Sequence, residues 1–138
     1  MTNEPHIRVG EVMQREVHTV DPMTTVREAL QAMAKHKVSS MVIERRDKTD
    51  EFALIVVSDI AGEVIAANRS PDRVSVYEIM SKPVLTLDED MHIKYGIRLL
   101  HRFGLSRGLV TDHERNLVGI VTLRDMVLRY AKADAGPQ

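Results

Sequence analysis

The chain has 138 residues, of which 43% are hydrophobic and 28% charged, and its formal net charge is −1. This length and apolar content are sufficient for one domain or two closely packed half-domains. The balanced charge gives no general attraction to nucleic acid or anionic membranes, and the absence of cysteine excludes thiol nucleophiles, disulfides and thiolate metal sites.

The amino terminus lacks the basic segment and apolar run of a signal peptide, and no apolar stretch reaches membrane-spanning length. We therefore expect a soluble, cytoplasmic protein without a membrane partner. Histidines and carboxylates are the remaining side chains expected to serve as metal ligands or acid–base groups.

The first half of the chain predicts the order helix, strand, helix, strand, strand, helix. Thr25 and Glu28 form a capping-box pattern at the start of the second helix, and the charged stretch 44–51 predicts a hairpin tip in water. The expected ranges are 9–13 for a short helical turn, 16–20 for an extended segment, 25–35 for a helix, 38–43 and 52–57 for two strands, and 60–67 for a closing helix.

The second half predicts the same order. Its main helix, which contains Ile93, Ile97 and Leu100, is expected to be capped by Asp88 or Asp90. The other expected ranges are 76–80 for a helical turn, 84–87 for an extended segment, 105–110 and 117–122 for two strands, and a last helix around Met126, Val127 and Tyr130.

The two halves are copies of one unit. Glu11-Val12-Met13 recurs 67 positions later as Glu78-Ile79-Met80, and the offset becomes 66 at Asp59 and Asp125 because the second hairpin turn is one residue shorter. Further matches at 67 are Val17, Thr19, Asp21 and Met33 with Val84, Thr86, Asp88 and Leu100. We expect the copies to share a core and to leave clefts at a pseudo-symmetric interface.

The domain boundaries predicted from this repeat are residues 8–68 for the first copy and 74–131 for the second. Residues 69–73 form a polar, proline-bearing connector, and residues 1–7 and 132–138 are expected to be loose ends.

Five segments support a family resemblance: Val12-Met13, Ile79-Met80-Ser81-Lys82-Pro83-Val84, Val38-Ser39-Ser40, Leu105-Ser106-Arg107 and the run from Leu117 to Met126. With these segments the chain resembles a tandem pair of cystathionine-β-synthase-type (CBS) domains, the Bateman module. It is similar to stand-alone CBS-domain proteins of the bacterial type. The resemblance covers roughly Val9 to Ala131, nearly the whole chain.

The resemblance implies an α/β (α+β) fold with one β-α-β-β-α unit per copy and the two sheets packed face to face about a pseudo-twofold axis. It implies two clefts that bind adenosine nucleotides or related adenosyl ligands, and pairing into flat, disc-like dimers. It also implies a sensing function, in which ligand occupancy is passed to an enzyme, channel or transporter domain.

The segment from Gly119 to Asp125 carries the strongest chemical motif. A strand is expected to end at Thr122 where a helix begins, so the first free backbone N–H groups suit a phosphate, while Asp125 suits ribose hydroxyls. In the family the matching positions bind ribose and phosphate. The alternative is a helix N-cap, since Thr-x-x-Asp is close to a capping box.

The first copy departs from this motif. Ala53 replaces the glycine and Val56 replaces the hydroxyl residue, while Asp59 is kept and Ser58 lies beside it. Valine cannot donate to a phosphate, so we expect the first cleft to bind more weakly, to prefer a ligand without phosphate, or to be empty.

Positive charge for the phosphate is expected from His36 and Lys37 across the interface; the alternative is a solvated helix end. An adenine slot is expected from Val84, Leu105, Gly108 and Leu109, with ordinary core packing as the alternative. The full predicted nucleotide-binding set is His36, Lys37, Val84, Leu105, Ser106, Arg107, Gly108, Leu109, Thr122, Arg124 and Asp125, and the weaker set is Val17, Ser39, Ser40, Ser58 and Asp59.

No catalytic motif occurs, and the histidines have no metal-ligand spacing, so neither catalysis nor a metal site is expected. We predict a non-catalytic regulatory module that binds an adenosyl ligand (AMP, ADP, ATP or S-adenosylmethionine), forms a homodimer and signals to a separate effector protein. The first alternative is a structural oligomerisation or docking module without ligand, and a more remote one is a nucleotide-processing enzyme. Nucleic acid is not an expected partner.

Overall fold

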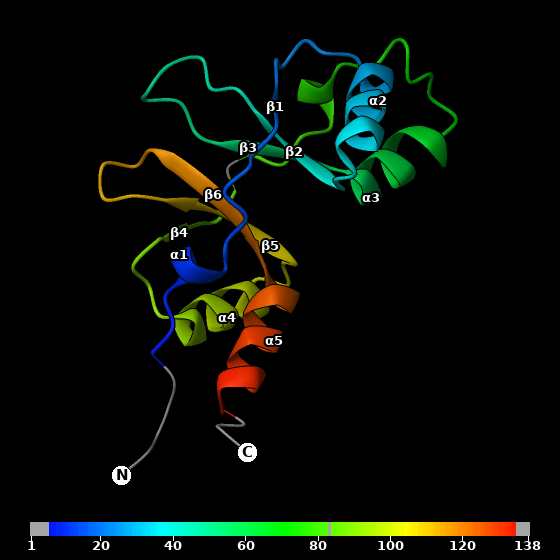
Figure 1. The fold of residues 1–138 in the computed structure, drawn as a ribbon. Helices are drawn as coiled ribbons and strands as arrows, with labels where there is room; N and C mark the ends of the chain where they lie inside the picture. The colour runs from blue at the N-terminus through cyan, green and yellow to red at the C-terminus, as the bar shows by residue number, and fades with distance from the viewer. Residues whose placement is uncertain (1–5, 83, 135–138) are drawn as a thin grey trace. The chain divides into compact units, whose positions relative to one another are not determined.

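Two small three-stranded sheets, each with its own helices, form the protein in a computed structural model that describes residues 6–82 and 84–134 (Figure 1). The described residues divide into two compact units. Unit 1 combines those of Met1–Val17 and Leu85–Gln138, and unit 2 contains those of His18–Val84. The predicted α/β class and the order of elements in both halves are confirmed.

Unit 1 has the sheet order β4-β5-β6, formed by Thr86–Asp88, Arg107–Thr111 and Leu117–Thr122. β4 is parallel to β5, and β5 is antiparallel to β6. Parallel neighbours need a crossover connection, which is supplied by α4 (Ile93–Arg102). The short α1 (Val9–Val12) and the long α5 (Leu123–Asp134) complete the unit.

The start of α4 differs from the prediction. Its N-cap is His92, whose Nδ1 accepts the backbone N–H of Lys94 at 3.0 Å, so the predicted cap by Asp88 or Asp90 is wrong. Asp88 instead forms a local turn in which its Oδ1 accepts the N–H of Asp90 at 2.8 Å.

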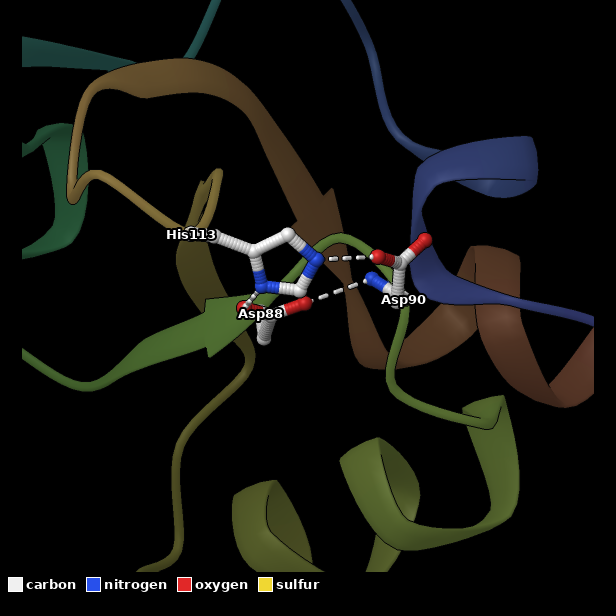
Figure 2. Close-up of side chains that lie close together, drawn as sticks. All are labelled: Asp88, Asp90 and His113. Atoms are coloured by element: carbon white, nitrogen blue, oxygen red, sulfur yellow. Dashed lines mark hydrogen bonds and ion pairs between the residues drawn. The ribbon is translucent and has the colours of Figure 1, made fainter.

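The turn between β5 and β6 is held by Asp112. Its carboxylate accepts the backbone N–H groups of Glu114 and Asn116, each at 2.9 Å. This turn reaches the loop that follows β4, and Figure 2 shows His113 of the turn beside Asp88 and Asp90.

Unit 2 has the sheet order β1-β2-β3, formed by Thr19–Val20, Ser40–Ile43 and Ala53–Val56. α2 (Val26–His36) connects the parallel strands β1 and β2, and it begins at the predicted capping box of Thr25 and Glu28. After β3, α3 (Val57–Ile60) passes into a π-helix, η1 (Ala61–Ile65), and η2 (Val76–Glu78) is a single 3₁₀ turn.

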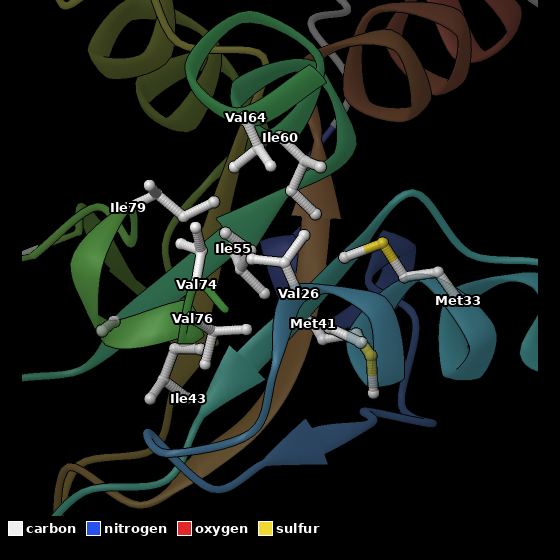
Figure 3. Packing of buried hydrophobic residues seen from close by; sticks show 12 residues of the cluster. Val26, Met33, Met41, Ile43, Ile55, Ile60, Val64, Val74, Val76 and Ile79 are labelled. Carbon is white, nitrogen blue, oxygen red and sulfur yellow. The ribbon is translucent and has the colours of Figure 1, made fainter. Parts of the chain in front are cut away.

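The core of unit 2 is purely apolar. Figure 3 shows Val26 of α2 and Ile55 of β3 packed with Val74 and Val76, which come from the segment that opens the second repeat. The buried members are Val26, Ala29, Met33, Met41, Ile43, Ala53, Ile55, Ile60, Val64, Val74, Val76 and Ile79.

Each unit thus contains the opening segment of the other repeat. In unit 1, Ile93 N–H donates to the Ile7 carbonyl, and in unit 2, Val26 N–H donates to the Val74 carbonyl, both at 2.8 Å. The same exchange recurs farther along, where Gln14 bridges to Ile120 and Ser81 bridges to Leu54. The boundaries of the packed units therefore fall at different places from those of the sequence repeats.

The predicted loose ends lie partly outside the described residues, as does Pro83 of the family segment. Where the ends are described, Ile7 is buried in the core of unit 1 and α5 extends to Asp134. Among the helices of residues 6–82 and 84–134, none has both the length and the apolarity required to cross a membrane.

Candidate functional site

The junction of β6 and α5 in unit 1 brings together the polar residues of the Gly119–Asp125 motif. Thr122 is the last residue of β6, and its Oγ1 accepts the backbone N–H of Asp125 at 3.0 Å. Thr122 therefore acts as the helix N-cap, as the alternative interpretation of the motif expects. Because the hydroxyl accepts this bond through a lone pair, its own proton can still be donated to a ligand oxygen.

The start of β5 lies directly beside this junction. Arg107 pairs with Thr122 in the sheet, and the N–H of Leu123 donates to the Ser106 carbonyl at 2.8 Å. Arg107 Nε also lies 3.4 Å from Ser106 Oγ. The structure therefore brings Ser106 and Arg107 together with Thr122, as the predicted set requires.

The charges at the junction are mixed. Arg124 is exposed, and its Nη1 lies 3.8 Å from Asp125 Oδ1, a distance that makes a loose surface ion pair. Two guanidinium groups, a hydroxyl and the first turn of a twelve-residue helix favour an anion, while the carboxylate of Asp125 can accept hydrogen bonds from hydroxyl groups.

The apolar members of the predicted set have other packing roles. Gly108 is buried in β5, where an added Cβ would lie 3.3 Å from the Leu85 carbonyl oxygen and 3.5 Å from Leu100 Cδ2. Leu109 is fully buried and donates its N–H to the Leu85 carbonyl, and Leu105 is 39% exposed. Gly108 therefore packs in the core near Leu100, as the alternative of ordinary core packing expects. An adenine slot at Leu105 and Leu109 stays a prediction.

Unit 2 has the same backbone arrangement with different side chains. The N–H of Val57 donates to the Ser39 carbonyl at 2.9 Å, and Ser40 pairs with Val56 in the sheet. Val56 forms no side-chain cap. Asp59 follows in the first turn of α3, but Ser40 and Ser58 stand where unit 1 has Arg107 and Arg124.

The helix that follows is also different. α3 has four residues before the backbone becomes a five-residue π-helix, whereas α5 is regular over twelve residues. A short helix has a weaker macrodipole, so the backbone of unit 2 offers less stabilisation to an anion.

The basic pair of the prediction lies in unit 2 at the end of α2. His36 stacks on His18, with ring centroids 3.8 Å apart, and Lys37 is the C-cap with φ +57°, in the left-handed region. The matching position of unit 1 is Gly104, with φ +64°. Their approach to a phosphate held by Thr122 stays a prediction.

Two valines fall outside the unit that contains most of their predicted set. Val84 belongs to unit 2, with His36 and Lys37, and Val17 belongs to unit 1, because the exchanged opening segments extend to these two positions. Their contribution to either cleft also stays a prediction.

One group of polar side chains was not predicted. Asp88, Asp90 and His113 lie together in unit 1, with one potential ligand atom from each residue within 4.8 Å of the others (Figure 2). His113 Nε2 is 2.7 Å from Asp90 Oδ2, and Nδ1 is 3.2 Å from Asp88 Oδ2. The sequence spacing of these three residues does not form a recognisable metal-ligand motif. The signal that could have predicted the group is the pairing of Asp88 with Thr111, which brings Asp88 close to the turn that contains His113.

The negative charge of this group acts on the imidazole. Asp88 raises the pKa of His113 electrostatically, and the hydrogen bond to Asp90 raises it further.

Comparison with known proteins gives the family. A model of the CBS domain matches residues 9–57 and 76–132, which is most of the chain and both repeats. An uncharacterized protein of Methanopyrus kandleri is 34% identical over 121 residues, covering 88% of this chain and 61% of that protein.

Solved structures agree with this match. The hexameric CBS-CP12 protein from bloom-forming cyanobacteria has a TM-score of 0.87 and 25% identity, covering 96% of this chain and 72% of that one. The CBS domain pair of protein MJ0100, in complex with 5′-methylthioadenosine and S-adenosyl-L-methionine, has a TM-score of 0.78 and 25% identity, covering 94% and 99%.

The chain spans between 39% and 61% of the length of the first three curated relatives that it matches. Both repeats are nevertheless matched separately by the family model, in the order and with the spacing of the two sheets described above. The chain belongs to the CBS domain family, as a tandem CBS domain pair.

Proposed function

We propose that the protein is a regulatory module that binds an adenosyl ligand at the β6–α5 junction of unit 1. The observation that carries the proposal is the convergence of Ser106, Arg107, Thr122 and Asp125 at this junction. A hydroxyl and two guanidinium groups suit the anionic phosphates of AMP, ADP and ATP, which are therefore the first ligands to test. S-adenosylmethionine, whose sulfonium is positively charged, is the next.

The difference between the units supports one strong site. Unit 2 keeps the carboxylate of Asp59 but has Val56 and Ser40 in place of the threonine and the arginine. The structural relative in complex with 5′-methylthioadenosine and S-adenosyl-L-methionine supports the adenosyl class of ligand.

The test is isothermal titration of the purified protein with AMP, ADP, ATP and S-adenosylmethionine, with GTP as a control. We expect saturable binding of an adenosyl ligand at about one per chain and loss of at least tenfold in affinity in Thr122→Val, which gives unit 1 the residue of unit 2. Asp125→Asn should also weaken binding because it removes the negative charge and replaces one of the two acceptor oxygens for ribose hydroxyls by an NH₂ donor.

Matched controls come from the other unit. Asp59→Asn should leave the strong site unchanged, and Val56→Thr should strengthen any weak second binding step. If Asp59→Asn weakens binding as much as Asp125→Asn, the assignment to unit 1 is wrong. If no adenosyl ligand binds and the variants remain folded, the docking module becomes the better description.

We also propose that the module self-associates through the outer face of α4 and α5. Tyr95 of α4, Phe103 at its C-cap and Leu128 of α5 are each more than half exposed, and exposed apolar side chains that form one patch mark interaction surfaces. Light scattering after size-exclusion chromatography should give twice the chain mass, and Leu128→Glu should give the monomer without loss of helix content. An unchanged mass in Leu128→Glu would place the interface elsewhere.

The effector protein is expected to be separate from the residues described and to respond to ligand occupancy. No enzymatic step is required of the module. A cheap check is incubation with ATP followed by chromatography of the nucleotide, in which we expect no product.

A further inference from the structure

We propose that Asp88, Asp90 and His113 form a binding site for a divalent transition-metal cation of the zinc class. Asp88 is the last residue of β4, Asp90 lies in the loop after it and His113 lies in the β5–β6 turn, and Figure 2 shows their side chains converging. One atom from each residue lies within 4.8 Å of the other two, a spacing that one bound cation can bridge with small side-chain rotations.

The donor set fits this class of metal. Imidazole nitrogen and carboxylate oxygen are both ordinary ligands of Zn²⁺, at about 2.0 to 2.2 Å. Three protein ligands leave a further position for water, so the site is expected to be open. Mg²⁺ and Ca²⁺ prefer oxygen alone, so the imidazole favours a transition metal over them.

The ligands are held in place by their own backbone. Asp88 Oδ1 accepts the N–H of Asp90 at 2.8 Å, which orients the Asp88 carboxylate and leaves Oδ2 toward the imidazole. The Glu89 N–H between them donates to the Thr111 carbonyl at 2.9 Å, and Asp112 fixes the turn that carries His113. Such outer contacts reduce the reorganisation needed to bind a metal.

The local charge favours a cation. Asp88, Glu89 and Asp90 are consecutive acidic residues, and carboxylate oxygens of Asp88 and Asp90 lie 3.2 Å and 2.7 Å from the imidazole nitrogens of His113. Arg8 contacts Asp90 from the other oxygen, with Nη1 3.6 Å from Oδ1, so Oδ2 remains directed to His113.

Unit 2 has the same turn without the ligands. Asp21 Oδ1 accepts the N–H of Met23 at 2.8 Å, as Asp88 Oδ1 does for Asp90. The positions that match Asp90 and His113 at the offset of 67 are Met23 and Arg46, which cannot bind a cation. The fold therefore does not require the cluster, since the other unit forms its turn with one aspartate.

The alternative explanation of this geometry is an ion pair without metal, in which the imidazolium form of His113 pairs with both carboxylates. A metal site requires stoichiometric metal binding, whereas the metal-free ion pair shows none. A bound metal would also clamp the β5–β6 turn to the loop before α4, so it would slow hydrogen exchange in both segments.

The experiment is equilibrium dialysis of the EDTA-treated full chain against ZnCl₂, with NiCl₂ and MgCl₂ in parallel and without nucleotide. We expect saturable binding of one Zn²⁺ per chain, weaker binding of Mg²⁺, and a loss of at least tenfold in Zn²⁺ affinity in both His113→Gln and Asp90→Asn. Binding of Co²⁺ should add visible absorption bands in the wild type that both variants lose.

The matched control is Asp21→Asn, which alters the equivalent turn of unit 2 and should leave Zn²⁺ affinity unchanged. Circular dichroism verifies that each variant is folded. Absence of saturable Zn²⁺ binding, or binding that persists unchanged in both folded variants, would overturn the proposal in favour of the metal-free pair. Because nucleotide is left out, neither result depends on the adenosyl site.

Discussion

Unit 1 and unit 2 have the same β-α-β-β-α order, yet they differ at both ends of their hairpins, β5–β6 and β2–β3. At the open end, unit 1 has Thr122 and Arg107 where unit 2 has Val56 and Ser40. At the turn, unit 1 directs His113 to two aspartates, whereas the turn of unit 2 directs Asp50 to Lys82.

This difference separates what the fold requires from what has been added to it. Features present in both units, such as the exchanged opening segments, are needed for folding. Features present in one unit only, such as the arginine–threonine pair, are not required by the architecture. They are therefore the better guides to ligand binding.

The largest expected effects come from the exchanged segments. Val9 and Val76 occupy matching positions and are fully buried. Each truncation to alanine should cost about 2 kcal/mol, in the range of other buried aliphatic truncations. Val9→Ala should destabilise unit 1 and Val76→Ala unit 2, although each residue belongs to the opposite repeat.

Hydrogen exchange followed by NMR or mass spectrometry reads this directly. Val9→Ala should speed exchange in β5, and Val76→Ala should speed it in β2. If Val9→Ala acted mainly on β2, the exchange of segments would be refuted.

The next largest effect is expected at Gly119. A Cβ there would lie 2.8 Å from the Gln14 carbonyl oxygen and 2.6 Å from Met13 Sδ, and the backbone atom has little room to move. Gly119→Ala should therefore destabilise unit 1 by roughly 1 to 2 kcal/mol, as other overpacked substitutions do.

Unit 2 has Ala53 at the matching position, where the methyl group is buried. Ala53→Gly is therefore the reverse change, expected to cost about 0.5 to 1 kcal/mol through backbone entropy, to which the lost burial of the methyl group adds. Urea unfolding measures both, and a neutral Gly119→Ala would show that the opening segment adapts. The glycine of the family motif thus has a packing role.

Much of the fold could be predicted from the sequence because it depends on local patterns. The apolar spacing and the Thr25–Glu28 capping box predicted the position of α2, and the repeat predicted the position of α4 in the same way. The cap of α4 was missed because histidine is not among the usual capping residues, whereas two aspartates lie nearby.

The remaining features depend on contacts between distant residues. The repeat is visible as a local pattern, but which opening segment packs in which unit is decided by long-range packing. The same applies to His113, which meets Asp88 only because β4 and β5 are paired in one register. The junction at Thr122 was predictable because its residues are adjacent in a strand-to-helix motif.

The pH dependence of stability should distinguish the two hairpins. Asp50 of unit 2 accepts a hydrogen bond from Lys82 Nζ at 2.7 Å and one from Arg46 N–H at 3.1 Å, and the Lys82 bond in particular holds the pKa of this carboxyl well below its ordinary value. A folded-state pKa below the unfolded one stabilises the protein above the unfolded value of about 3.9, and this stability is lost as pH falls below it.

Asp50→Asn should therefore lower the melting temperature by a few degrees at pH 7 and flatten its decline in acid. Lys82→Gln should reproduce the loss at pH 7, because the partner of Asp50 is removed. Equal acid sensitivity of wild type and Asp50→Asn would show that other carboxylates, such as Asp112 with its own lowered pKa, control acid unfolding.

The smallest expected effect lies at the C-terminal ends of α2 and α4. Lys37 and Gly104 have nearly the same left-handed φ, but only glycine adopts it without strain. Lys37→Gly should stabilise unit 2 by about 0.5 to 1 kcal/mol, and Gly104→Ala should destabilise unit 1 by a similar amount. Both values come from chemical denaturation. If Lys37→Gly leaves the free energy of unfolding unchanged, the left-handed backbone at the end of α2 carries no strain.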